Sequence, residues 1–68
     1  MLAQAFRRWQ RKHALSAVEI ARVASVSRQC VRNWVTGENE PLVGSVLVLE
    51  RKWPGLLKEL QRSSMRAA

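Results

Sequence analysis

LSAVEIARVASVSRQCVRNWVTG, residues 15 to 37, is the stretch that decides the fold of this chain. Ser16 followed three residues later by Glu19 is typical of a capping box at the start of a helix. In this arrangement the serine hydroxyl accepts from the Glu19 amide, and the carboxylate reaches back to the Ser16 amide. A helix is therefore predicted to begin at Ala17. Its apolar pattern breaks at residues 24–26, and a helix this short needs a packing partner.

A second helix is predicted directly after this break. Ser27 is suited to cap its start, Arg28 to Thr36 would form it, and Gly37 can take the left-handed conformation that ends it. At about 100° per residue, an apolar side of this helix faces away from a polar side. The apolar side holds Val31, Trp34 and Val35, and the polar side holds Gln29, Arg32, Asn33 and Thr36.

The polar side of this second helix has side chains that can read DNA. The amides of Gln29 and Asn33 can pair with adenine in the major groove, and the nearby arginines can bind guanine or phosphate. A merely solvated face is the alternative for an isolated helix, but the preceding capped helix, the short turn and the positive charge favour DNA binding. The predicted DNA contacts are Ser27, Arg28, Gln29, Arg32, Asn33 and Thr36, together with Arg7 and Arg11 of an earlier helix.

The segment EIARVASVSRQCVRNWVTGENEP resembles the helix-turn-helix of Cro/repressor-type phage and bacterial regulators. The resemblance covers about residues 5 to 50 and implies an all-α, compact domain of four to five helices with the helix-turn-helix at about 17–36. It also implies binding to operator DNA. The residues that match the family pattern in type and spacing are Ile20, Ala21, Val26, Ser27, Arg28, Val31, Trp34, Gly37 and Pro41.

Three residues depart from the family pattern. Ser25 and Ala14 stand where the family usually has glycine, so a left-handed backbone at either position would be strained. Ala17 replaces the glutamine that commonly binds a phosphate in the family, which weakens the expected hold on DNA.

Length and composition limit the other possibilities. A chain of 68 residues forms one domain at most and buries only about 60% of its unfolded surface. We predict one domain over 1–62 and a disordered tail over 63–68. One cysteine excludes an intrachain disulfide, and with a single histidine it cannot build a four-ligand zinc site. No cofactor or metal is therefore expected. Because so short a chain buries little surface, we expect a second chain to provide additional stability.

The net charge of the chain limits the classes of molecule that it can bind. Twelve Lys and Arg against five acidic residues give a net charge of +7, which attracts DNA, RNA, anionic lipid or an acidic protein patch. Residues 2–13 form a predicted amphipathic helix whose basic side could lie on a membrane surface. In the resembling family this helix packs behind the helix-turn-helix and its basic face can touch the DNA backbone. The chain has no long apolar run and no secretory core, so a cytoplasmic protein without a membrane partner is expected.

The segment after Gly37 is predicted to form two further helices. The first begins near Pro41 and buries a stripe made of Leu42, Val46, Leu49 and Trp53. A strand over 44–50 is the alternative, since this run is rich in β-branched residues. The second helix follows Pro54 and Gly55 and spans Leu56 to about Arg62.

Apolar residues outside this stripe predict a homodimer. A surface helix of a single chain normally has a polar side that faces water. Residues 46–49 would make this helix apolar on nearly every side. A second copy of the chain is expected to cover the surplus. The predicted interface consists of Val43, Leu47, Val48, Leu56, Leu57 and Leu60.

No catalytic arrangement is evident in the sequence. Glu19 belongs to a cap, Glu38 and Glu40 lie in a polar turn, and Cys30 has no plausible base beside it. A passive role for Cys30 is favoured over a redox switch. The chain is therefore predicted not to be an enzyme.

A small homodimeric transcriptional regulator that binds a palindromic operator through residues 28–36 is the predicted function. The alternative is a protein antagonist on the same scaffold that binds and blocks another transcription factor or a host protein. Ala17, the acids at 38 and 40, and the surplus apolar surface at 46–49 favour that alternative.

Overall fold

The structure, a computed structural model, describes the backbone of residues 2–67 and the side chains of residues 2–63. Over these residues the chain is all helical and has no strand, which confirms the predicted all-α class. The strand alternative for 44–50 is wrong, because this run lies within the fourth helix. The helices are α1 (Leu2–Lys12), α2 (Ala17–Ala24), α3 (Arg28–Thr36), α4 (Val43–Lys52) and α5 (Leu56–Ala67).

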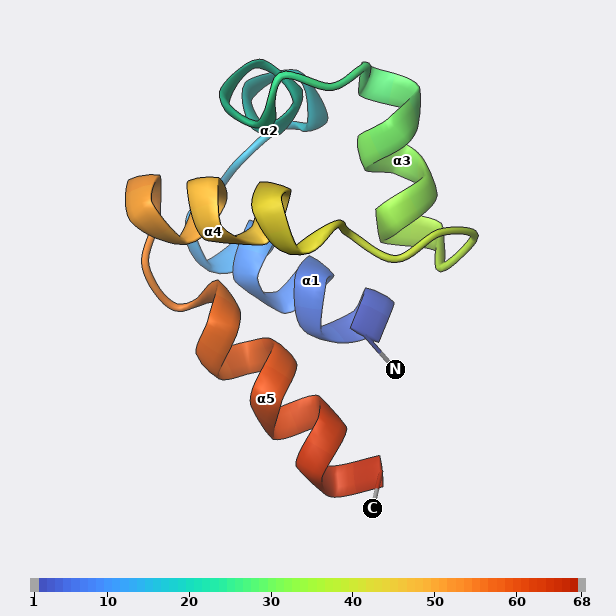
Figure 1. Cartoon of the computed structure of the whole chain (residues 1–68), viewed down its shortest axis with the longest axis vertical. Coiled ribbons are helices and arrows are strands. Elements are labelled where there is room, and N and C mark those ends of the chain that lie inside the picture. Colours follow the sequence, from blue (N-terminus) through green and yellow to red (C-terminus); the bar gives the residue numbers. More distant parts are fainter. Residues whose placement is uncertain (1, 68) are drawn as a thin grey trace.

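Each helix packs against two others: α1 on α3 and α5, α2 on α3 and α4, and α4 on α5. In Figure 1, α2 and α3 lie at one end of the long axis, α5 extends toward the other, and α1 and α4 lie between them. The N-terminal end of α4 lies on the side of α3, and its C-terminal end points away from α3. No helix among the described residues is long and apolar enough to cross a membrane.

Serine side chains cap the starts of α2 and α3, as predicted. The Ser16 hydroxyl accepts from the Glu19 amide at 3.2 Å, and the Ser27 hydroxyl accepts from the Cys30 amide at 3.1 Å. The Glu19 carboxylate differs from the expected capping box, because it accepts from the Ser16 hydroxyl at 3.3 Å. Gly37, with a φ of 89°, ends α3.

Ser25 and Ala14 both have a left-handed backbone. Ser25 has φ 58° and ψ 43° at the end of α2, and Ala14 has φ 54° in the loop after α1. These are the two positions at which the resemblance predicts glycine. The backbone is strained at both residues, because the Cβ atom of a non-glycine residue lies too close to the backbone in this conformation.

An aromatic cluster joins α1 to the rest of the core. The rings of Phe6 and Trp34 meet edge to face at 5.8 Å, and those of Trp9 and Trp53 at 6.2 Å. The Trp9 indole also donates to the Trp53 carbonyl at 2.8 Å. The largest fully buried side chains are Trp9, Phe6, Ile20, Leu49, Leu56 and Val31. Helix α1 supplies the two largest of these side chains, and it packs directly against α3 and α5.

Two leucines occupy environments opposite to those predicted. Leu42, expected in the core stripe, is 71% exposed, because it precedes α4 in an extended conformation. Leu56, expected in the dimer interface, is fully buried within one chain, so it cannot belong to an exposed interface. The rest of the stripe is confirmed, with Val46 and Leu49 buried and Trp53 packed against the core.

Helix α5 packs against α1 and α4, and polar contacts at its first turn and an ion pair add to this packing. The Glu50 carboxylate of α4 accepts from the Leu57 amide at 2.8 Å and from the Gly55 amide. The Arg8 guanidinium of α1 pairs with the Glu59 carboxylate at 2.9 Å. Helix α5 continues to Ala67, beyond its predicted end near residue 62. Residues 56–67 contain no glycine or proline that would end the helix. Of the predicted tail over 63–68, residue 68 lies outside the described residues.

Candidate nucleic-acid interface

Helix α3 presents a polar face to solvent and is held by its apolar face. Arg28, Gln29, Arg32 and Thr36 are exposed, and Asn33 is half-buried. Val31 and Trp34, on the other face, are fully or almost fully buried. The predicted division of this helix into a packing side and a solvent side is therefore confirmed. Because the buried side is anchored in the core, the polar side chains project from a fixed helix.

The two amide side chains on this face are in contact. The Gln29 Nε2 donates to the Asn33 Oδ1 at 3.0 Å, one helical turn apart. This hydrogen bond leaves the Gln29 carbonyl oxygen free to accept and the Asn33 amide nitrogen free to donate. Bidentate pairing with adenine uses the oxygen and the nitrogen of one amide group, and the Gln29 amide, which has a second N–H, keeps both an acceptor and a donor for it.

The hydroxyls of this face are partly used within α3. The Thr36 Oγ1 donates to the Asn33 carbonyl at 3.3 Å, while the Ser27 Oγ accepts from the Cys30 amide. The Ser27 hydroxyl keeps its own proton and lies at the positive end of the helix dipole. Together with the exposed Arg28, it gives the start of α3 the chemistry that binds phosphate.

Arg7 is brought to α3, but in a structural contact. Its Nη1 donates to the Val35 carbonyl at 2.6 Å, near the C-terminal end of α3. Carbonyls in the last turn of a helix have no partner within the helix, and a cation there is favourable. The other guanidinium donors of Arg7 remain available. Arg11 lies one turn further along α1 and is exposed, so it can reach a phosphate without losing a contact of this kind.

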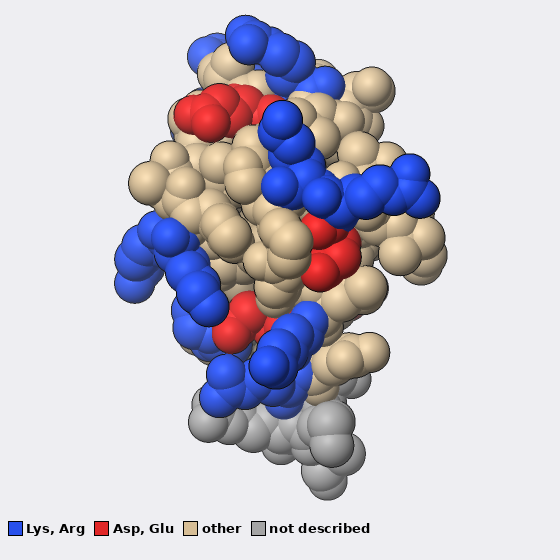
Figure 2. All heavy atoms as spheres, turned by 90° about the vertical axis from the view of Figure 1, so that its left-hand side faces the viewer, with Lys and Arg blue, Asp and Glu red and all other residues tan. Residues whose placement is uncertain are grey.

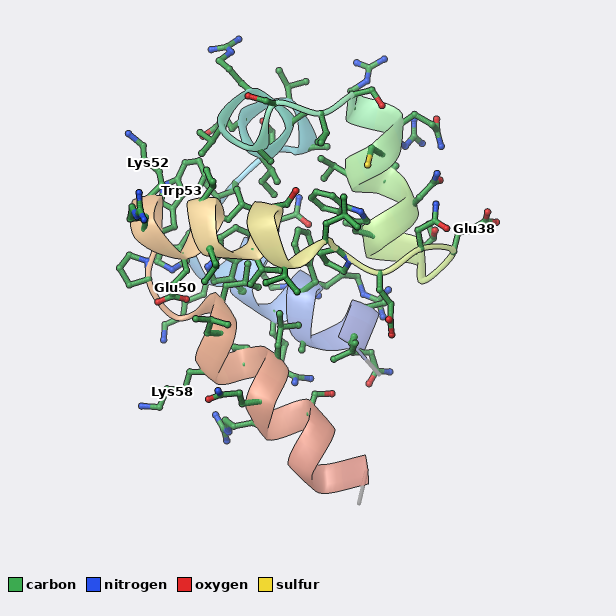
Figure 3. All side chains as sticks on the ribbon, in the orientation of Figure 1. Glu38, Glu50, Lys52, Trp53 and Lys58 are labelled. Atoms are coloured by element: carbon green, nitrogen blue, oxygen red, sulfur yellow. The ribbon has the colours of Figure 1, made fainter. Side chains whose placement is uncertain are left out.

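An acidic turn limits this surface at the end of α3. Glu38, Asn39 and Glu40 are exposed, and the Asn39 amide donates to the Asn33 carbonyl at 3.2 Å, which ties the turn to α3. Figure 3 shows the Glu38 side chain pointing outward from this turn. Carboxylates repel phosphate, so anion binding is favoured at the start and middle of α3.

Positive charge is not confined to α3. Figure 2 views the molecule from the side away from α3, and lysine and arginine side chains lie in separate groups over this face, with acidic side chains between them. Lys52 and Lys58 extend on this side in Figure 3. The net charge of the chain therefore supports attraction to polyanions in general, and α3 is distinguished by its amides.

The role of Glu50 was not predicted from the sequence. Its pKa is lowered mainly by the hydrogen bond from the Leu57 amide, with further lowering by the Gly55 amide, against a smaller opposing effect of burial. The Glu50 side chain thus caps α5 from another helix, as its direction in Figure 3 shows. The sequence holds one sign that α5 is capped from elsewhere. Pro54 and Gly55 precede α5, so the helix has no serine, threonine or aspartate of its own to cap its start.

No metal-binding group is evident in the part of the chain whose side chains are described, where no three His, Cys or Glu residues are placed to hold an ion. Cys30 is a free thiol, half-buried on α3.

The chain has no match among models of known protein families, among curated proteins or among solved structures. The assignment of function therefore rests on the chain's own residues and geometry.

Proposed function

We propose that this chain is a small cytoplasmic, homodimeric transcriptional regulator, and not an enzyme, that binds operator DNA through a helix-turn-helix formed by α2 and α3. The observation that carries the proposal is the exposed, paired amide face of α3, with Gln29 bonded to Asn33, on a helix anchored by Val31 and Trp34. A merely solvated helix face needs no such combination of adjacent amides and arginines.

In the proposed complex, α3 enters the major groove with its N-terminal half toward the bases. Gln29 and Asn33 pair with adenine, each good bidentate contact discriminating by about 1 to 3 kcal/mol. Arg28 and the Ser27 hydroxyl bind phosphate or guanine at the start of the helix. Arg11 contacts the DNA backbone from α1. A palindromic operator would be bound by two chains, with half-sites about one helical turn apart.

An antagonist that binds and blocks another transcription factor is a second candidate function. It is favoured by the exposed apolar side chains Leu42, Val43 and Leu47 beside the acidic turn of Glu38 and Glu40. Such a protein would use this apolar surface and would not need the amides of α3.

Selection from a randomised DNA pool, followed by fluorescence polarisation on the enriched duplex and on a scrambled duplex, tests the proposal. Gln29→Ala should weaken binding to the enriched duplex by about 1 to 3 kcal/mol, or roughly 5- to 150-fold, and should change scrambled binding little. Arg28→Ala should weaken binding to the enriched duplex alone if Arg28 binds guanine, and to both duplexes if it binds phosphate. Lys58→Ala, on the side away from α3, serves as the matched control and should leave the discrimination between the two duplexes unchanged.

Two results would contradict the DNA reading. If no sequence is enriched and the wild type binds no duplex, the antagonist is the better assignment. If Gln29→Ala weakens enriched and scrambled binding in parallel, α3 does not read bases. Circular dichroism of each variant checks that the fold is intact.

A further inference from the structure

Three of the five exposed large hydrophobic residues of the described chain lie in helix α4. Val43 is 76%, Leu47 49% and Val48 43% exposed, while Val46 and Leu49 on the opposite side are buried. At about 100° per residue, residues 43, 44, 47, 48 and 51 share one side of this helix. We call this side the α4 stripe. Contiguous exposed apolar surface of this kind marks an interaction site.

Gly44 lies within the α4 stripe without a reason in the single chain. Its backbone is helical, so it needs no left-handed freedom, and a Cβ added to it would meet nothing within 4 Å. Glycine destabilises a helix relative to alanine. Its effect on the surface is to open a gap between the exposed Val43 and Val48, into which a side chain from another molecule fits.

Charges of opposite sign lie at the two ends of the α4 stripe. Glu38 and Glu40 precede the helix, and Arg51 and Lys52 form its last turn, and all four are exposed. The helix has 10 residues and is about 15 Å long. If two copies of α4 lie antiparallel, the acids of each copy face the bases of the other. A parallel arrangement would bring like charges together.

We propose that the α4 stripe binds a second copy of this chain, with the two α4 helices crossing antiparallel about a two-fold axis near Leu47. With the axis level with the step from Val46 to Leu47, Leu47 lies next to Leu47 of the other copy, and Val48 lies within one residue of the level of Gly44 of the other copy. The surface is self-complementary, as a two-fold interface must be. The proposal deepens the homodimer included in the proposed function, but it does not depend on DNA binding.

The proposed interface replaces the broader one predicted from the sequence. It keeps Val43, Leu47 and Val48 and excludes Leu56, which is buried in its own chain, while Leu57 and Leu60 pack against their own core. No residue of α3 takes part, so its amide face stays free in the dimer. Because the stripe is short, we expect a weak dimer with a dissociation constant on the order of micromolar.

Sedimentation equilibrium of the wild type between about 1 and 500 µM tests the proposal. A monomer–dimer equilibrium is expected, and Leu47→Glu should raise the dissociation constant by about 100-fold or more. Val18→Glu is the matched control, because Val18 is 45% exposed on α2 and does not belong to the stripe, and this change should leave the equilibrium unaltered. A wild type that stays monomeric, or a Leu47→Glu variant that dimerises as before, would overturn the proposal.

Two further variants test the register and the orientation. Gly44→Ala should raise the melting temperature of the dilute monomer yet weaken dimerisation about 10-fold, whereas a purely intrachain role would leave dimerisation unchanged. Arg51→Glu should weaken the dimer, and Arg51→Glu combined with Glu40→Arg should restore it. Failure of the double variant to restore dimerisation would overturn the antiparallel arrangement.

Binding to a half-site duplex separates this proposal from the DNA-binding function. The monomeric Leu47→Glu variant should keep the sequence discrimination of α3 on a half-site. A wild type that stays monomeric would therefore contradict the interface and the homodimer, but not the reading of bases by α3, whereas loss of discrimination would contradict the DNA-binding function and not the interface.

Discussion

Ser25 combines a helix end with backbone strain. Its φ of 58° and ψ of 43° place it in the left-handed region, while its amide donates to the Ala21 carbonyl and closes α2. The neighbouring Val26 amide bonds to the same carbonyl at 3.0 Å. These hydrogen bonds and the packing of both helices hold a conformation that a serine avoids in isolation.

Replacing Ser25 by glycine should therefore stabilise the protein. We expect Ser25→Gly to raise the free energy of unfolding by about 0.4 to 1 kcal/mol, since glycine adopts this conformation without strain. Thermal melts would show a rise of roughly 2 to 8 °C. Ser27→Ala is the contrasting control, because it removes the cap of α3 and should cost about 0.5 to 2 kcal/mol. An unchanged melting temperature in Ser25→Gly would mean that the turn is not strained at this residue.

Glu50 links stability to pH. Its pKa lies below the ordinary value of 4.5 in the folded chain, chiefly because the Leu57 amide donates to the carboxylate. A carboxyl with a lowered folded pKa stabilises the fold above its unfolded pKa, and this stabilisation is lost as the pH falls through the folded value. The pKa of Glu59 is also lowered, chiefly by the hydrogen bond from Arg8.

Glu50→Gln should lower stability at pH 7 by about 1 to 3 kcal/mol, because a neutral amide is a weaker acceptor for the start of α5. The wild type should lose stability on acidification below about pH 4.5, and the variant should lose less, so that their melting temperatures converge. Thermal melts between about pH 3 and pH 7 measure this. Glu40→Gln, in the exposed turn, should follow the wild type. If the melting temperatures of Glu50→Gln and the wild type fall in parallel with pH, Glu50 is not the cause of the loss of stability in acid.

At the scale of the helices, α1 both fills the core and holds α3. Phe6 and Trp34 join the two helices through their rings, and Arg7 binds the Val35 carbonyl near the end of α3. The orientation of the polar face of α3 therefore depends on a helix that precedes it by more than a dozen residues. If α3 binds DNA as proposed, a change in α1 would alter that binding without a direct contact to DNA.

Arg7 and Arg11 should consequently differ on mutation although both lie on the basic side of α1. Arg7→Ala should lower the free energy of unfolding by about 1 to 2 kcal/mol, because a charged donor to the end of α3 is lost. Arg11→Ala should leave stability within about 0.5 kcal/mol of the wild type, as expected for an exposed side chain. Chemical denaturation measures both. Equal losses, or none for Arg7→Ala, would show that the Val35 contact does not support α3.

At the scale of the whole molecule, the basic side chains surround the fold. The net charge is +7, and Figure 2 shows lysine and arginine on the side away from α3. Long-range attraction to DNA therefore does not orient α3 by itself. Orientation has to come from contacts at short range, through the amides and the start of α3.

For the proposed complex, the salt dependence of binding measures the number of phosphates that the chain contacts. Arg28, Arg32, Arg7 and Arg11 are the candidate cations at the interface, so the logarithm of the binding constant on a half-site should fall against the logarithm of salt with a slope of about −3 to −4. Arg11→Ala should reduce that slope by about one, and Lys58→Ala should not change it. Polarisation titrations from about 50 to 300 mM salt measure the slope. If Arg11→Ala and Lys58→Ala reduce the slope equally, the DNA also contacts the side of the molecule away from α3.

The sequence by itself determined the local features of this protein. The caps of α2 and α3, the glycine end of α3 and the division of α3 into buried and exposed sides depend on residues within about one helical turn of each other, where a linear pattern is sufficient. The left-handed positions 14 and 25 followed from the resemblance. Only the tertiary structure decided that Leu42 is exposed and Leu56 buried, that Arg7 supports α3, and that Glu50 caps α5. These features depend on where distant helices pack, and the periodicity of one helix carries no information about the position of another.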